Sequence, residues 1–189
     1  MRKNKTFKKK DYYSNDGFQV SVWGPIAWTF LHTISFNYPT HPTELQKKQY
    51  RNYVLSLQNV LPCGACRKNL KNNLKMHPLT MEDMKDRDTF SRYIYELHEI
   101  VNKMLHKESK LSYEEVRERY EHFRARCTKE DEKEEKEENK KKKEKGCTEP
   151  LYGKKARCIL SIVPKEIKGQ SLQIDRRCTR RRRHSRVRK

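Results

Sequence analysis

Two cysteines three positions apart, Cys63 and Cys66 in the sequence Cys-Gly-Ala-Cys, are the residues whose type and spacing most directly predict chemistry. They follow Pro62 and open a helical pattern, so both thiols are expected near a helix N-terminus. There the free backbone amides and the helix dipole favour the thiolate over the thiol. Thiolates attack disulfides, and a pair at this spacing can itself be oxidised to a disulfide. The motif therefore predicts a redox-active dithiol with Cys63 and Cys66 as the catalytic residues.

Other uses of a CxxC pair fit the flanking sequence less well. A thioredoxin-like motif needs a βαβ setting, and helical patterns lie on both sides of this pair. A c-type haem site needs His directly after the second cysteine, where Arg67 stands. A zinc site needs two further ligands at compatible spacing. We expect no metal site, because no second close pair exists among the other cysteines, which are Cys127, Cys147, Cys158 and Cys178.

Two further pairs of polar and aromatic residues share helix faces. Trp28 and His32 are four residues apart in one helical pattern, and His98 and Asn102 are four apart in another. Together they could line a pocket for a flat, hydrogen-bonding cofactor near the CxxC pair. Each pair taken alone is equally consistent with packing in a helical core.

The segments that must position these residues are predicted as helices, and together they predict an all-α fold. Apolar residues recur at helical spacing through the region 18–123, and no convincing alternation typical of a strand appears there. Five helices in about 110 residues predict a four-helix bundle plus a short fifth helix. The expected helix starts are Pro25 in a first turn, a capping box of Thr43 with Gln46, the Cys63 region, a cap at Asp88, and a capping box of Ser112 with Glu115.

Composition limits the packed core to part of the chain. The 189 residues carry a net charge of +20, with 37% charged and 33% hydrophobic residues. No apolar run is long enough for a membrane span, and the basic start has no secretory signal core. The segment 128–146 has eight lysines and eight acidic residues, whereas 147–189 has fourteen lysines or arginines against three acids. We predict a basic arm at 1–13, one domain at 14–127, a charged linker at 128–146 that could form a single helix, and a basic, largely disordered tail at 147–189.

The segment 23–33 carries a resemblance to a known family. In it Gly24, Trp28 and His32 are spaced four residues apart, and Tyr38-Pro39 follows. This arrangement resembles the opening motif of the Erv/Alr family of FAD-linked sulfhydryl oxidases.

Two more motifs of that family follow in the same order. The CxxC pair comes after a long predicted helix, and the segment 98–103 is similar to the third motif, in which a His and an Asn stand four apart. Glu99 differs from the Asn that is common at its position. The resemblance covers roughly 15–123, and the short form with a polar tail is similar to members from large cytoplasmic DNA viruses.

The resemblance implies a flavin-binding helical bundle, usually a homodimer, with FAD as the cofactor. It implies that Cys66 is the thiol next to the flavin and that Cys63 exchanges disulfides with the incoming dithiol. Electrons would pass from protein dithiols through FAD to molecular oxygen, yielding hydrogen peroxide. The implied cofactor-binding residues are Gly24, Trp28, His32, Tyr38, His98, Asn102, Lys103, Lys107 and Tyr120.

The tail suggests further roles. Cys147 and Cys158 are candidates for a mobile shuttle dithiol, as family members often have one; the alternative is that these tail cysteines have no redox role. The arginines of 176–183 could bind polyanions non-specifically, or they could form a localisation signal. The compartment expected from the viral resemblance is the host cytoplasm or the virion. The alternative from another class is a basic nucleic-acid-associated protein, perhaps zinc-binding, without catalysis.

Overall fold

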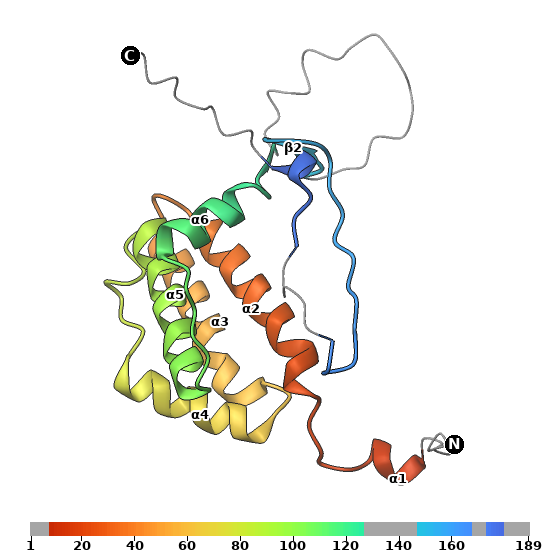
Figure 1. Cartoon of the computed structure of the whole chain (residues 1–189). Helices are drawn as coiled ribbons and strands as arrows, with labels where there is room; N and C mark the ends of the chain where they lie inside the picture. The colour runs from red at the N-terminus through yellow and green to blue at the C-terminus, as the bar shows by residue number, and fades with distance from the viewer. Residues whose placement is uncertain (1–7, 127–146, 168–172, 180–189) are drawn as a thin grey trace, which may run out of the picture. The chain divides into compact units, whose positions relative to one another are not determined.

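A computed structural model describes residues 8–126, 147–167 and 173–179 of the chain (Figure 1). It divides into two compact units, the first ending at Glu108 and the second beginning at Ser109. Several predictions concern residues outside these ranges: most of the basic arm, Cys127, the linker 128–146, and the tail segments 168–172 and 180–189.

The first unit consists of helices whose apolar faces meet in one core. Helix α2 packs against α5, α3 against α4, and α4 against α5. The core includes Tyr38, Val54, Phe90 and Leu97. The helices of this unit are α1 Lys9–Tyr12, α2 Val20–Phe36, α3 Glu44–Val60, α4 Gly64–Met76 and α5 Arg87–Met104.

The second unit contains one helix and a small antiparallel strand pair. Ala125 pairs with Pro150 and Arg126 with Glu149, a feature that the sequence pattern did not predict. Gly153 has a φ of +69°, and a Cβ there would lie 2.6 Å from the backbone of Cys178, so glycine is required at this turn. The elements are α6 Tyr113–Glu121, β1 Ala125–Arg126, β2 Glu149–Pro150 and a 3-10 turn at Arg176–Cys178.

The predicted all-α class with about five main helices is confirmed by α2 to α6. Both predicted capping boxes are present: Thr43 accepts from the Gln46 amide, and Ser112 accepts from the Glu115 amide. Within the described part of the chain, no helix is both long and apolar enough to cross a membrane.

Two predicted helix starts were wrong. Helix α2 begins at Val20, so Pro25 lies inside the helix rather than in its first turn. The carbonyl that Pro25 leaves without a helical donor belongs to Ser21, an exposed residue of the first turn, where water can replace the bond. Helix α5 is capped by Asp86 instead of Asp88, because Asp86 has the extended backbone of a cap and its carboxylate accepts from the Thr89 amide at 3.0 Å.

Candidate redox-active site

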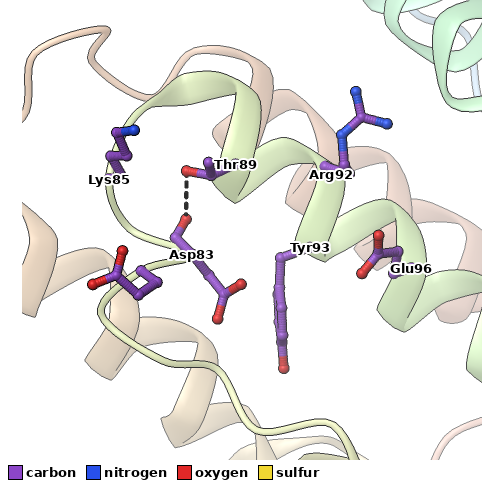
Figure 2. Close-up of a pocket in the computed structure, with 7 residues that line it drawn as sticks. Asp83, Lys85, Thr89, Arg92, Tyr93 and Glu96 are labelled. Carbon is purple, nitrogen blue, oxygen red and sulfur yellow. Dashed lines mark hydrogen bonds between the residues drawn. The ribbon is translucent and has the colours of Figure 1, made fainter.

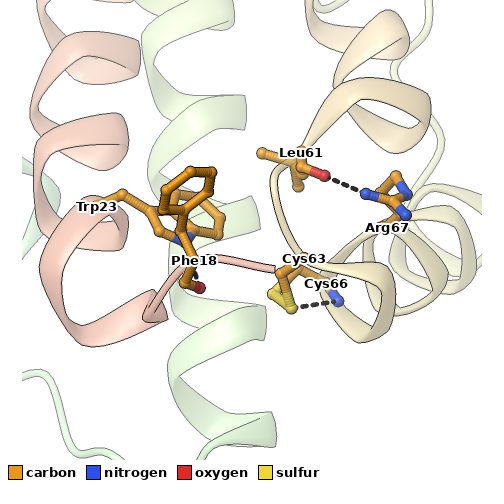
Figure 3. The surroundings of a disulfide bond; sticks show 6 residues. All are labelled: Phe18, Trp23, Leu61, Cys63, Cys66 and Arg67. Carbon is orange, nitrogen blue, oxygen red and sulfur yellow. Dashed lines mark hydrogen bonds between the residues drawn. A yellow bond between two sulfur atoms is a disulfide. The ribbon is translucent and has the colours of Figure 1, made fainter. Parts of the chain in front are cut away.

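The CxxC pair forms a disulfide at the N-terminus of α4. Cys63 is the N-cap residue, and the Cys66 amide donates to its sulfur at 3.2 Å (Figure 3). Both residues are partly exposed. The Arg67 side chain donates to the Leu61 carbonyl at 2.5 Å, which ties the first turn of α4 to the loop before it. The predicted placement of both sulfurs at a helix N-terminus is therefore confirmed.

The segment before α2 lies directly against this loop. The Phe18 amide donates to the Pro62 carbonyl at 3.1 Å, and the Trp23 indole donates to the Phe18 carbonyl at 3.1 Å. Phe18 itself is 76% exposed beside the disulfide (Figure 3). These two hydrogen bonds anchor the start of α2 beside the cysteine pair. Sequence reasoning missed the contact, since no local signal connects residues 44 positions apart.

Gly17 is the residue that permits this contact. A Cβ at position 17 would lie 2.6 Å from the Pro62 carbonyl oxygen and 3.3 Å from the Cys63 Cα. Both neighbours are backbone atoms, so the segment 17–18 would have to move away.

We expect Gly17→Ala to lower the free energy of unfolding by about 1–3 kcal/mol, the usual cost of overpacking, and to accelerate reduction of the disulfide by dithiothreitol. The matched control is Gly64→Ala, where the new Cβ meets only Arg67 Nη2 at 3.7 Å; we expect it to be neutral or slightly stabilising. Urea unfolding and reduction kinetics measure both effects. An unchanged urea midpoint for Gly17→Ala would show that the segment does not rest on Pro62.

A cluster of aromatic and imidazole rings joins α2 to α5. The Trp28 ring stacks on the His98 ring with centroids 4.0 Å apart and planes 7° apart. His32 Nε2 lies 3.0 Å from His98 Nδ1, within hydrogen-bonding distance. His32 is only 3% exposed and also stacks on Phe36. The sequence placed Trp28 with His32 on one face, and the structure brings His98 to both of them.

Both histidines are held neutral. Burial, and then the neighbouring His98 ring, lower the pKa of His32 to about 3. Burial also lowers the pKa of His98 to about 4; nearby Glu99 opposes this shift and Lys107 adds to it. Near pH 7 the pair therefore presents uncharged ring nitrogens, which can donate and accept hydrogen bonds but carry no positive charge.

We expect the free energy of unfolding to fall as the pH decreases from about 6.5 towards 4. In this range the unfolded chain protonates its imidazoles, whereas the folded protein keeps His32 and His98 neutral, so protons favour the unfolded state. The loss at pH 5 is about 2 kcal/mol for each imidazole. Urea midpoints at about pH 7 and about pH 5 measure it.

The control for this pH effect is His41, an exposed residue. His32→Gln should reduce the difference between the two midpoints, and His41→Gln should leave it as in the wild type. Equal differences in all three proteins would contradict the assignment.

The other predicted cofactor-binding residues lie in varied settings. Gly24 is buried in α2. Tyr38 is fully buried in the core and its hydroxyl donates to the Met84 carbonyl at 3.0 Å. The Asn102 amide donates to Glu99 Oε1 at 3.0 Å. Lys103 and Lys107 are exposed at the end of α5 and beyond it.

Three predicted residues belong to the second unit. Tyr120 lies in α6, with its ring 6.1 Å from that of Phe123. Cys147 takes part in a disulfide, and Cys158 is a free, exposed cysteine. The roles predicted for these residues and for those of the first unit remain predictions.

A polar pocket lies in the first unit beside the beginning of α5 (Figure 2). Its lining includes Asp83, Lys85, Arg92 and Glu96, and the Thr89 hydroxyl donates to the Asp83 carbonyl at 3.0 Å. None of the predicted site residues lines it. The candidate site is therefore defined by the disulfide and by the ring cluster of α2 and α5. Among the residues that the structure describes, no group of three or more His, Cys, Asp or Glu side chains could hold a metal ion.

The sequence and the fold both match one protein family. The model of the Erv1/Alr family matches residues 25–121, just over half of the chain. The chain is 39% identical over 80 residues to a probable FAD-linked sulfhydryl oxidase of Acanthamoeba polyphaga mimivirus, an alignment covering 42% of this chain and 56% of that protein. It is 30% identical over 99 residues to an FAD-linked sulfhydryl oxidase of African swine fever virus, covering 52% of this chain and 80% of that protein.

Solved structures agree with this match. The yeast Erv1 core superposes with a TM-score of 0.50 and 26% identity, covering 64% of this chain and 94% of that one. The chain belongs to the Erv1/Alr family. It spans about half the length of several curated relatives, including 50% of the mitochondrial FAD-linked sulfhydryl oxidase of Saccharomyces cerevisiae.

Proposed function

We propose that this protein is an FAD-linked sulfhydryl oxidase that forms disulfides in protein substrates. The observation that carries the proposal is the Cys63–Cys66 disulfide at the N-terminus of α4, in a chain of this family. Both cysteines are partly exposed, as access for an incoming thiolate requires.

The first half of the reaction is thiol–disulfide exchange. A substrate thiolate attacks Cys63 Sγ, the Cys63–Cys66 bond breaks, and Cys66 leaves as a thiolate. The second substrate thiolate then attacks the substrate sulfur of the mixed disulfide, so that the substrate leaves as a disulfide and Cys63 is released as a thiolate. The Cys66 amide, which points at Cys63 Sγ, and the helix N-terminus stabilise the negative charge on this leaving sulfur.

The residues present fit a flavin. Trp28 and His98 offer flat faces for stacking, and the neutral His32–His98 pair offers ring nitrogens for hydrogen bonds in a buried setting. These three residues would hold FAD, with Gly24, Tyr38, Asn102, Lys103, Lys107 and Tyr120 as further contacts. Bound FAD would accept the two electrons of the reduced cysteine pair and return them to molecular oxygen, giving hydrogen peroxide. The role of the chain is to bind and orient the cofactor beside Cys66.

The remaining parts of the proposal concern partners and place of action. The substrates are protein dithiols, and the enzyme is a homodimer. Cys147 and Cys158 belong to a shuttle that passes electrons to the CxxC pair. The basic tail binds polyanions without sequence preference, and the protein acts in the host cytoplasm or the virion.

The test uses the full chain as purified. We expect a yellow protein with about one flavin per chain, which consumes oxygen in the presence of dithiothreitol and produces one hydrogen peroxide per disulfide formed. A colourless protein that contains stoichiometric zinc and consumes no oxygen would instead support the non-enzymatic alternative.

A further inference from the structure

The exposed face of α4 carries a row of lysines that starts at the disulfide. Gly64, between the two cysteines, is exposed, and so are Lys68, Lys71 and Lys75. At 3.6 residues per turn these four positions lie within about 60° of one another around the helix axis. The opposite face carries Leu70, Asn73 and Leu74, which are buried. We call Lys68, Lys71 and Lys75 the lysine stripe.

No acidic residue offsets this charge nearby in the sequence. The 37 residues from Leu45 to Met81 contain seven lysines or arginines and no Asp or Glu. Within the described residues, no ion pair involves a lysine of the stripe. By contrast, Lys47 of α3 is bound to Glu44 at 2.7 Å. The three lysines are therefore exposed and form no ion pair within the described part of the chain.

The other helices show that this is a local feature and does not simply follow from the basic composition. Helix α2 contains no Lys, Arg, Asp or Glu, and α5 contains three basic and three acidic residues. Helix α6 contains four acidic residues against two arginines. Helix α4 has four basic residues and no acid, the largest imbalance among α2 to α6. Positive charge is thus concentrated on the helix that carries the reactive disulfide.

We propose that the lysine stripe is the docking surface for an acidic protein whose cysteine pair is the substrate of the Cys63–Cys66 disulfide. This inference rests on the proposed oxidase function and adds the class of partner. The stripe extends about 16 Å along α4 from the disulfide, so acidic residues flanking a substrate cysteine could contact it while the sulfurs react. Such complementarity raises association rates by about 10–1,000-fold at low ionic strength and is weakened by salt.

The experiment compares two reduced peptides of equal length, each with one cysteine pair, flanked by four Glu in one and by four Lys in the other. We expect kcat/KM for the acidic peptide to exceed that for the basic peptide by about 10-fold or more at low salt, mainly through KM. The ratio should approach one at about 1 M salt. The variant Lys68→Glu/Lys71→Glu/Lys75→Glu should reverse the preference. Each rate is divided by the rate with dithiothreitol, an uncharged dithiol.

The matched control changes the net charge equally at exposed lysines outside α4: Lys48→Glu/Lys85→Glu/Lys110→Glu. It should keep the preference for the acidic peptide. Equal kcat/KM for the two peptides, or a preference lost equally in both triple variants, would overturn the docking proposal. The proposal would also be overturned if the lysine stripe bound a 20-base single-stranded DNA while the enzyme showed no preference between the two peptides. The stripe would then be a general polyanion site. Absence of dithiothreitol oxidation in the wild type would instead refute the oxidase function itself.

Discussion

Replacing Cys66 by Ser is expected to lower the rate of thiol oxidation by more than about 100-fold, as truncation of a reacting group does. Cys63→Ser should be equally severe, because the disulfide that receives the substrate electrons can no longer form. Oxygen consumption with dithiothreitol measures both losses. The control is Cys178→Ser, which changes a free cysteine of the second unit and should retain the wild-type rate.

Cys66→Ser and Cys63→Ser should differ in how much mixed disulfide with the substrate they accumulate. In Cys66→Ser the remaining Cys63 lies at the N-cap of α4. There the backbone amide of residue 66 and the helix N-terminus favour its thiolate. We expect the Cys63 thiolate to attack the disulfide of an oxidised substrate, so that a mixed disulfide forms and the other substrate sulfur leaves as a thiolate. Intact-mass spectrometry detects this adduct. Cys63→Ser should accumulate less of this adduct. If Cys63→Ser accumulated more of the adduct than Cys66→Ser, Cys66 rather than Cys63 would be the cysteine that reacts with the substrate.

Replacing His98 by Ala is expected to reduce the flavin that copurifies with the protein by about 10-fold or more, equivalent to about 1.4 kcal/mol of binding free energy or more. The substitution removes the ring that stacks on Trp28 and the ring nitrogen 3.0 Å from His32. It also leaves a buried imidazole without that partner. Flavin released from a known amount of protein gives the occupancy.

Two further variants separate flavin binding from folding. His98→Gln keeps a polar group that can reach His32 and should retain more flavin than His98→Ala. His41→Ala removes an exposed histidine and should leave occupancy unchanged. If His98→Ala retained a full complement of flavin while remaining folded, the ring cluster of α2 and α5 would not be the cofactor site.

The local features of this protein followed from its sequence. The CxxC pair at the start of a helix, the capping boxes at Thr43 and Ser112, and the helical spacing of apolar residues each depend on contacts within about one turn of the chain. Such contacts are set by neighbouring residues, so they can be recognised without a fold. The three ordered motifs added the family resemblance, which the comparisons confirmed.

The sequence predicted two helix starts wrongly, because more than one residue nearby could begin the helix. Asp86 and Asp88 are both acceptable caps, and the choice between them depended on the backbone conformation at Asp86. Pro25 suits a first turn, yet α2 begins five residues earlier, where the Trp23 indole bonds the Phe18 carbonyl. Tyr38 also has a core role that no local signal indicated, since its hydroxyl donates to the Met84 carbonyl; its predicted contact with the cofactor stays a prediction.

The amino-acid sequence by itself determined which residues carry redox chemistry, that they begin a helix, and which family the chain resembles. Only the tertiary structure placed His98 against Trp28 and His32, and Gly17 against Pro62. These contacts join residues 45 to 70 positions apart, and they arise from how the helices of the first unit and the segments before them pack. Packing depends on the shapes of all the buried side chains together, so no short stretch of sequence contains that information.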